Sequence, residues 1–348
     1  MNSIYNYTLD ELGDYFISLG DKKYRALQIF EWLYRFRVKN FDEMTNLSKK
    51  VIEHLKENFT MNLLTLERLQ VSSDGTRKYL FKLADGHFIE SVLMRHNYGN
   101  SICVTSEVGC NMGCAFCASG ELGCVRRLTL EEMVLQVLTV QKDLDKEAAR
   151  ITNVVVMGIG EPFDNYEVLL KFLTVINYPK GLEIGARHIT VSTCGIVPKI
   201  KEFADFPLQI NLALSLHAPN NKLRSSLMKI NKAYPLEEVM DAIRYYYDKT
   251  NRRVTFEYIL LHGINDTLEC AKELIKLIRG INVYVNLIPY NEVSTKPFKQ
   301  TPHNDAEEFF SILHKAGINV TLRMEHGSDI DAACGQLRAK RMREDKNE

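Results

Sequence analysis

Apolar positions recur at helical spacing through the first 60 residues, in three runs that polar residues separate. Gly20 divides the first run from the second. The runs consist of Leu9, Leu12, Phe16 and Ile17, then Ala26, Ile29, Phe30 and Leu33, then Leu47, Val51, Ile52 and Leu55. This spacing predicts an N-terminal helical accessory domain over residues 1–62.

The hydrophobic pattern changes to that of short strands after this module. Apolar runs at 70–73, 78–83 and 88–95 favour strands. The pairs Asp74-Gly75 and Asp85-Gly86 between them are typical of hairpin turns. We therefore predict a short β-hairpin extension, or linker, over residues 63–98.

From residue 99 onward, apolar strand patterns alternate with helical ones. Thr129–Leu144, Glu237–Tyr247 and Leu268–Ile278 are examples of the helical patterns, and Thr129 and Glu132 have capping-box spacing. The expected strands are 101–106, 153–157, 188–193, 209–216, 253–260, 284–288 and 319–323. Alternation of this kind predicts an α/β fold with a parallel sheet, here a partial (β/α)6-type barrel over residues 99–337. The charged tail 338–348 should fray, with its basic residues in solvent.

Composition limits the partners and the compartment. Lys plus Arg equals Asp plus Glu at 44 each, so any contact with nucleic acid must use local basic patches. Eight cysteines in 348 residues do not form a disulfide scaffold and favour a reducing compartment. The chain shows no leader peptide and no long apolar run. We expect a cytoplasmic monomer that does not bind a membrane.

Basic residues cluster between positions 22 and 39, with aromatic residues among them. The basic residues are Lys22, Lys23, Arg25, Arg35, Arg37 and Lys39, and the aromatic ones are Tyr24, Trp32 and Tyr34. Such a module can be an RNA-docking surface, with Arg126 and Arg127 as further candidates. It can equally be a solvated helix face with its aromatic residues in the core.

Three cysteines, Cys110, Cys114 and Cys117, have the spacing C-x3-C-x2-C. Thiolates this close together favour a soft metal centre, and a 4Fe–4S cluster fits best. Three ligands leave one iron open, as a catalytic centre requires. The spacing resembles the signature of the radical S-adenosylmethionine (SAM) enzymes, in which the open iron binds SAM. The alternatives are unliganded thiols, or a zinc site completed by a residue such as Cys103 or Cys124.

Polar residues follow the predicted strands at their carboxyl ends, where the reactive centre of a parallel barrel lies. These residues are Gly158, Gly160, Glu161, Ser192, Ser215, His217, Glu257 and Asn291. The turn with Gly158 and Gly160 lacks the third glycine of dinucleotide folds, and Glu161 would repel a pyrophosphate. A carboxylate suits the ammonium group of SAM instead. Taken singly, His217 could be a hydrogen-bonded histidine under a loop, and the glycines a tight turn.

Two further cysteines fall near this predicted rim. Cys103 precedes the cysteine triplet, and Cys334 lies in a loop of small residues after the last strand. A thiol beside a reactive centre can be a nucleophile or a redox partner. Cys334 could equally be a small buried apolar residue.

Together these motifs make the chain resemble the RlmN/Cfr family of radical SAM adenine methyltransferases. The resemblance runs almost end to end through CNMGCAFC, GIGEPFDNY, VSTCGIVP, LALSLHAPN, FEYILLHGIND, VNLIPYN and GSDIDAACGQL. It implies that Cys110, Cys114 and Cys117 ligate one 4Fe–4S cluster per chain. It also implies SAM contacts from Gly160, Glu161, Ser192, Ser215, Leu216, His217 and Asn291.

The same resemblance assigns the reaction. Cys334 would carry a methyl group from one SAM, and a second SAM would allow its transfer to C2 of an adenine through a covalent protein–RNA intermediate. Glu90 would deprotonate C2, although Ser91 beside it departs from the usual Glu-Thr. Cys103 would release the product and leave a disulfide with Cys334. The implied substrates are 23S rRNA at the peptidyl-transferase centre and the tRNA anticodon loop, with an electron donor of the flavodoxin or ferredoxin type.

Three alternatives remain open from the sequence. Pro162 in GEPFDNY matches the C2-methylating type, whereas the C8-methylating Cfr type has Ala there, so C8 methylation is the first alternative. A radical SAM enzyme with a non-RNA substrate is the second, but it would not need Cys103 and Cys334 together. An RNA-binding protein with a structural zinc is the third.

Overall fold

We describe the fold from a computed structural model, which defines residues 1–120, 123–293, 295–323, 327, 329–331 and 335–344. The N-terminal module contains α1 (Leu9–Ser18), α2 (Tyr24–Glu31) and α3 (Lys49–Asn58). Strand β1 (Asn2–Ser3) pairs with β2 (Phe59–Thr60), which brings the two ends of the module together. The predicted helices are therefore present.

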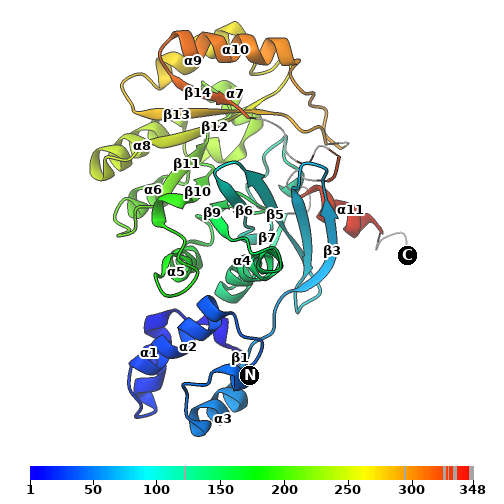
Figure 1. Cartoon of the computed structure of the whole chain (residues 1–348). Coiled ribbons are helices and arrows are strands. Elements are labelled where there is room, and N and C mark those ends of the chain that lie inside the picture. The colour runs from blue at the N-terminus through cyan, green and yellow to red at the C-terminus, as the bar shows by residue number, and fades with distance from the viewer. Residues whose placement is uncertain (121–122, 294, 324–326, 328, 332–334, 345–348) are drawn as a thin grey trace.

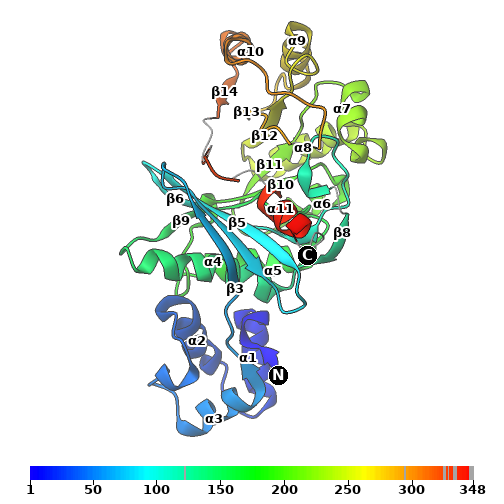
Figure 2. The same ribbon diagram turned by 90° about the vertical axis from the view of Figure 1, so that its right-hand side faces the viewer.

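The module sits at one end of the molecule, below the main sheet in both views (Figures 1 and 2). It contacts α4 (Leu130–Asp145), the helix that follows the loop with Cys110, Cys114 and Cys117. The Glu131 N–H donates to Oδ1 of Asn6 (2.9 Å), and the Arg37 guanidinium donates to both oxygens of Asp145 (2.7 and 3.0 Å). Their apolar residues join one continuous core. The module is thus held against the main α/β domain by polar and apolar contacts.

Within the described residues, the main sheet has ten strands in the order β14-β13-β12-β11-β10-β9-β6-β5-β4-β3. Pairing is parallel from β6 to β14 and antiparallel from β3 to β6. The strands are β3 (Thr65–Val71), β4 (Arg77–Lys82), β5 (Phe88–His96), β6 (Gly99–Cys103), β9 (Ile151–Val156), β10 (Ile189–Thr193), β11 (Asn211–Ser215), β12 (Val254–Leu260), β13 (Val283–Pro289) and β14 (Asn319–Leu322). The strand-and-helix alternation thus gives the expected partial barrel, and the β extension continues the same sheet.

Helices connect the parallel strands and cover the outside of the sheet (Figure 1). They are α4 (Leu130–Asp145), α5 (Tyr166–Asn177), α6 (Val197–Phe203), α7 (Asn221–Leu227), α8 (Leu236–Thr250), α9 (Leu268–Leu277) and α10 (His303–Lys315). Helix α4 begins with the expected capping box between Thr129 and Glu132. No helix in the described ranges combines the length and the apolar character needed to cross a membrane.

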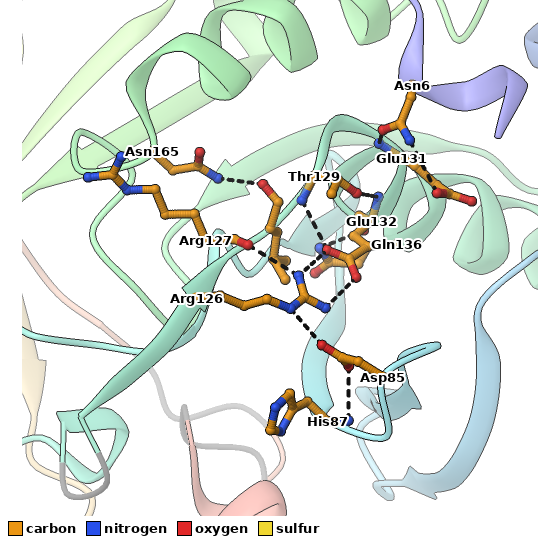
Figure 3. Close-up of polar contacts among 11 residues, drawn as sticks. Asn6, Asp85, His87, Arg126, Arg127, Thr129, Glu131, Glu132, Gln136 and Asn165 are labelled. Carbon is orange, nitrogen blue, oxygen red and sulfur yellow. Dashed lines mark hydrogen bonds and ion pairs between the residues drawn. The ribbon is translucent and has the colours of Figure 1, made fainter. Parts of the chain in front are cut away.

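The loop that carries Cys110, Cys114 and Cys117, called the cysteine loop below, connects the two strands of a small hairpin. Strands β7 (Glu107–Gly109) and β8 (Cys124–Arg127) pair antiparallel on either side of it. Arg126 of β8 donates to Asp85 in the β4–β5 turn (2.6 Å) and to both oxygens of Glu132 at the start of α4 (2.7 Å each) (Figure 3). One guanidinium therefore joins this hairpin, the β extension and the barrel.

The C-terminal segment differs from the expectation of a frayed tail. Residues 338–344 belong to α11 (Gln336–Glu344), which packs against the β extension (Figure 2). Leu337 is fully buried against Leu80 and Phe88, and Arg338 is buried as well. The burial of Leu337 anchors the helix, so the prediction of fraying is wrong for residues 338–344. Of the basic residues, Arg338 is buried, whereas Lys340 is exposed to solvent as predicted. Residues 345–348 lie outside the described residues.

Candidate active site

A cavity of about 380 Å³ lies at the carboxyl ends of the parallel strands. Its walls include thiols, small polar side chains and backbone from successive strand ends. Among the residues singled out from the sequence, it is lined by Cys103, Cys110, Cys114, Cys117, Gly158, Gly160, Glu161, Ser192, Ser215, His217, Glu257 and Asn291. The fold thus brings these residues together around one space.

The three cysteines of the triplet share this cavity. Burial raises the pKa of the Cys110 thiol, and burial together with the neighbouring Cys117 raises the pKa of Cys114 to about 12. Such thiols become thiolates only beside added positive charge, as iron supplies. Among the described residues, no three His, Cys, Asp or Glu side chains are close enough together to hold a single metal ion. A cluster, unlike one zinc ion, spreads its thiolate ligands over several irons.

Contacts from two other elements hold the cysteine loop. The Ala115 N–H donates to the carbonyl of Leu227 at the end of α7 (2.8 Å). The Tyr290 hydroxyl donates to the carbonyl of Phe116 (3.1 Å). The loop is therefore fixed between α7 and the segment after β13.

The turn after β9 needs its glycines for close packing. Gly160 has φ +110°, and a Cβ there would lie 2.7 Å from Oγ of Ser106 and 2.8 Å from the Glu107 side chain. A Cβ on Gly158 would lie 2.8 Å from the carbonyl of Val104. Both glycines let the turn lie against the segment before the cysteine loop, which explains the Gly-x-Gly spacing.

Glu161 is buried at the cavity wall. Its carboxylate accepts hydrogen bonds from the backbone N–H of Cys194 (2.8 Å) and of Phe163 (3.1 Å). Burial raises its pKa, and these N–H donors act in the opposite direction. The carboxyl group is therefore fixed in orientation and available to a cationic ligand group.

The other residues predicted to bind SAM divide into two sets. Ser192, Ser215 and Asn291 all line the cavity. The Ser192 hydroxyl donates a hydrogen bond to the carbonyl of Val156 (3.3 Å). Leu216 does not line it, because its side chain is fully buried in the main core. Only its backbone, whose N–H donates to the carbonyl of Glu257 (3.0 Å), lies near the strand ends.

His217 is a neutral imidazole in an unusual backbone conformation. Its φ is +57°, and its Nδ1 accepts the N–H of Ile259 (3.0 Å). Burial, with a smaller effect of Arg224, lowers its pKa to about 3. The ring lines the cavity and meets Phe116 edge to face at 5.0 Å. It is thus both a hydrogen-bonded histidine and a wall of the cavity.

The three residues with predicted catalytic roles lie in different places. Cys103 lines the cavity at the end of β6. Glu90 does not line it; its carboxylate accepts from the N–H groups of Gly335 (2.8 Å) and Arg338 (2.5 Å) and pairs with Lys78. Cys334 lies outside the described residues. No disulfide joins two of the described cysteines.

Sequence reasoning missed two buried charged residues beside the cavity. Arg224 of α7 is fully buried and donates to backbone carbonyls at the strand ends. Burial raises the pKa of Glu107, which accepts the N–H of Glu161, to about 8. Neither position shows a signal in the sequence, because each gains its environment only when distant segments pack.

The basic residues proposed as an RNA surface are largely paired with carboxylates. Arg126 pairs with Asp85 and Glu132, and Arg127 pairs with Asp164 (2.9 Å). Within 22–39 the ion pairs are Lys23–Asp10, Arg25–Asp21, Arg35–Glu31 and Arg37–Asp145. Lys22 and Lys39 are exposed, whereas Tyr34 is in the core. The burial of Tyr34 agrees with an aromatic residue in the core, and the RNA-docking surface stays a prediction.

A partial parallel barrel with this cysteine loop at its strand ends defines a radical SAM enzyme, and residues 105–278 match the Radical SAM superfamily. That superfamily uses a 4Fe–4S cluster and SAM. A crystal structure of a radical SAM methyltransferase from Sphaerobacter thermophilus superposes with a TM-score of 0.92 at 43% identity, over 97% of this chain and 99% of that one.

The family can be stated more closely. Residues 2–61 match the ribosomal RNA large subunit methyltransferase N-terminal domain. The probable dual-specificity RNA methyltransferase RlmN of Geobacillus kaustophilus is 57% identical, over 99% of this chain and 94% of its own length. That of Staphylococcus saprophyticus is 56% identical, over 97% and 93%. The chain belongs to the RlmN family of radical SAM RNA methyltransferases, as the resemblance in its motifs predicted.

Proposed function

We propose that this enzyme methylates C2 of an adenine in 23S rRNA and of an adenine in the tRNA anticodon loop. The observation that carries the proposal is the convergence of the cysteine triplet, Glu161 and Cys103 on one cavity, in a chain of this family. The C2 position is favoured by Pro162, which matches the C2-methylating type. Methylation of C8 is the alternative.

The residues that would hold the cofactors follow from the cavity walls. Cys110, Cys114 and Cys117 would ligate one 4Fe–4S cluster per chain, which together with SAM supplies radical chemistry when bound. Glu161 would accept the ammonium group of SAM, because its carboxyl group is fixed by two backbone N–H groups. Ser192, Ser215 and Asn291 would contact the remaining polar groups. The neutral ring of His217 would close one wall, with Leu216 contributing backbone only.

Two cysteines and a carboxylate would act on the RNA. Cys334 would carry the methyl group and bind the base covalently. Cys103, at the cavity wall, would attack the sulfur of Cys334, release the product and leave a disulfide that external reductant resets by exchange. Glu90 would take the proton from C2. Its carboxylate is held by Lys78 and by two backbone N–H groups, so it would have to exchange one of these partners for the substrate.

The remaining parts of the proposal concern the domains, the RNA substrate, the compartment and the electron donor. We propose residues 1–62 as an RNA-docking domain, 63–98 as a β extension and 99–337 as the catalytic core, with 338–348 as a C-terminal segment. The target base must leave its stack to enter the cavity, which favours loops over duplex RNA. We further propose a cytoplasmic monomer that takes electrons from a flavodoxin- or ferredoxin-type donor.

The test uses anaerobically reconstituted protein with SAM, reductant, a ribosomal RNA fragment and a tRNA. Mass spectrometry of digested nucleosides and of the protein compares wild type with Cys334→Ala, Cys103→Ala and Cys270→Ala. Cys270 is the matched control, since it packs in α9 and does not line the cavity. We expect 2-methyladenosine from wild type and Cys270→Ala, none from Cys334→Ala, and RNA crosslinked to Cys103→Ala. Product from Cys334→Ala would contradict the cysteine mechanism, and 8-methyladenosine would establish the alternative.

A further inference from the structure

Arg224 is a fully buried arginine beside the cavity. It belongs to α7 and was not among the residues predicted at the strand ends. Its guanidinium donates to the carbonyl of Cys194 (2.6 Å), to Oδ1 of Asn231 (2.9 Å) and to the carbonyl of Leu216 (3.3 Å). It also approaches the carbonyl of Ser215 (3.4 Å). Every one of these acceptors is neutral.

A carboxylate partner is missing from this arrangement. Among the residues that the structure describes, none of the ion pairs includes Arg224. Burial lowers its pKa, and its electrostatic partners are the thiols of Cys194 and Cys114. The other fully buried cation, Lys78, has Glu90 as its partner. Because a guanidinium stays charged and a buried charge without a counter-charge is unfavourable, Arg224 needs an anion that the described residues do not supply.

The position of Arg224 indicates what that anion is. The helix that carries it ends at Leu227, whose carbonyl accepts the N–H of Ala115, next to the cluster ligand Cys114. The positive charge of Arg224 opposes the effect of burial on the Cys114 thiol. The cation therefore lies behind the cysteine loop, between that loop and the ends of β10 and β11.

We propose that Arg224 is the built-in counter-ion of the iron–sulfur cluster and raises its reduction potential. A 4Fe–4S centre with three thiolates is anionic, and one-electron reduction adds a negative charge. A buried cation stabilises the reduced form more than the oxidised form. This inference rests on the proposed cluster at Cys110, Cys114 and Cys117.

A purely mechanical role makes a different prediction. Arg224 also braces the strand ends that carry Ser192 and Ser215, through the carbonyls of Cys194 and Ser215. If bracing were its only role, replacing it by any shorter side chain would disturb the site in the same way. If charge is what matters, lysine should substitute for arginine and glutamine should not.

The experiment measures the midpoint potential of the reconstituted cluster by EPR-monitored redox titration, without RNA. The variants are Arg224→Gln, Arg224→Lys and Lys229→Gln. Lys229 is the matched control, because it is an exposed cation whose side chain lies over Gly113 of the same loop. We expect Arg224→Gln to lower the potential, with the reduced-to-oxidised ratio at fixed potential falling on the order of tenfold, as the loss of one buried unit charge near the cluster would cause. Arg224→Lys and Lys229→Gln should stay close to wild type.

A second variant keeps the test decisive if Arg224→Gln does not fold. Asn231→Asp places a carboxylate beside the guanidinium at the position of an existing acceptor, and it should lower the potential in the same direction. Equal potentials in wild type, Arg224→Gln and Asn231→Asp, or equal shifts in Arg224→Gln and Arg224→Lys, would overturn the inference. A protein that reconstitutes no cluster would instead contradict the proposed cofactor.

Discussion

Nζ of Lys78 lies 2.7 Å from Oε2 of Glu90, and the two side chains are only 0% and 3% exposed. They come from the paired strands β4 and β5 of the extension. Glu90 also accepts the N–H groups of Gly335 and Arg338, at the start of α11. A single buried carboxylate thus joins the β extension to the segment that follows Cys334 in sequence. The extension is therefore tied to the start of α11 through this carboxylate.

Replacing Lys78 by methionine should destabilise the protein strongly. It leaves the Glu90 carboxylate buried without its cation, and breaking such a pair typically costs about 3–5 kcal/mol. Urea unfolding followed by circular dichroism measures the loss. Lys82→Met, an exposed lysine on the same strand, is the control and should change stability by less than about 0.5 kcal/mol. A loss below about 1 kcal/mol in Lys78→Met would show that the pair does not matter.

Gly160→Ala should weaken SAM binding by at least about tenfold, through overpacking that typically costs about 1–3 kcal/mol. The new Cβ would lie within 2.8 Å of Ser106 and Glu107, at a φ that disfavours side chains. The turn must then shift, together with Glu161. Equilibrium dialysis of SAM with the reconstituted protein measures the effect. Gly86→Ala shares the positive φ, but its Cβ meets nothing within 4 Å, so wild-type SAM binding is expected there.

The period of the hydrophobic pattern was enough to predict the barrel, because a buried parallel strand followed by an amphipathic helix has a local signature. Once the strands are placed, chain direction puts Ser192, Ser215 and Asn291 at one rim. Leu216, which the resemblance names as a SAM contact, directly follows Ser215, and adjacent residues at a strand end point to opposite sides. Its side chain enters the core.

Interactions between distant segments are what the sequence could not show. From the sequence, Arg224 would be expected on the surface of a short polar helix. Only the packing of α7 on the cysteine loop buries it. Similarly, α11 looks like a solvated tail because its charged residues outnumber its apolar ones. Its order comes from Leu337 packing on the extension and from the N–H groups that Glu90 accepts.

Stability should fall on mild acidification because of His217. Its pKa is lowered by burial from 6.5 to about 3, so below pH 6.5 the unfolded chain binds a proton that the folded chain excludes. This contribution is complete above pH 6.5 and is lost progressively as the pH falls toward 3. At pH 5.5 the loss is about 1 kcal/mol relative to pH 7.5.

Urea unfolding of the metal-free protein at these two pH values tests this contribution. The stability difference between pH 7.5 and pH 5.5 should be about 1 kcal/mol smaller in His217→Gln than in wild type. His303→Gln removes an imidazole that is 75% exposed, and its pH dependence should follow wild type. Identical pH dependence in His217→Gln and wild type would mean that the buried ring takes up its proton without penalty.

RNA affinity should depend on the basic residues that carry no intramolecular ion pair in the described structure. Lys22 and Lys39 are exposed, and no ion pair of either side chain is found among the described contacts. Arg37 already binds Asp145 through two hydrogen bonds. A phosphate would have to compete with that carboxylate, whereas it could bind either lysine directly.

Lys22→Gln and Lys39→Gln should each weaken RNA binding and reduce the slope of log affinity against log salt by about 0.7–0.9, the contribution of one phosphate contact. Arg37→Gln should leave that slope unchanged and instead loosen the contact between the N-terminal module and α4, with a loss of at most about 1 kcal/mol for a partly exposed pair. Fluorescence anisotropy with a labelled tRNA between 50 and 200 mM salt, about the range over which counterion release dominates, measures the slopes. A reduced slope in Arg37→Gln, with none in the two lysine variants, would move the RNA-binding surface to the paired arginines and require that RNA displaces Asp145 on docking.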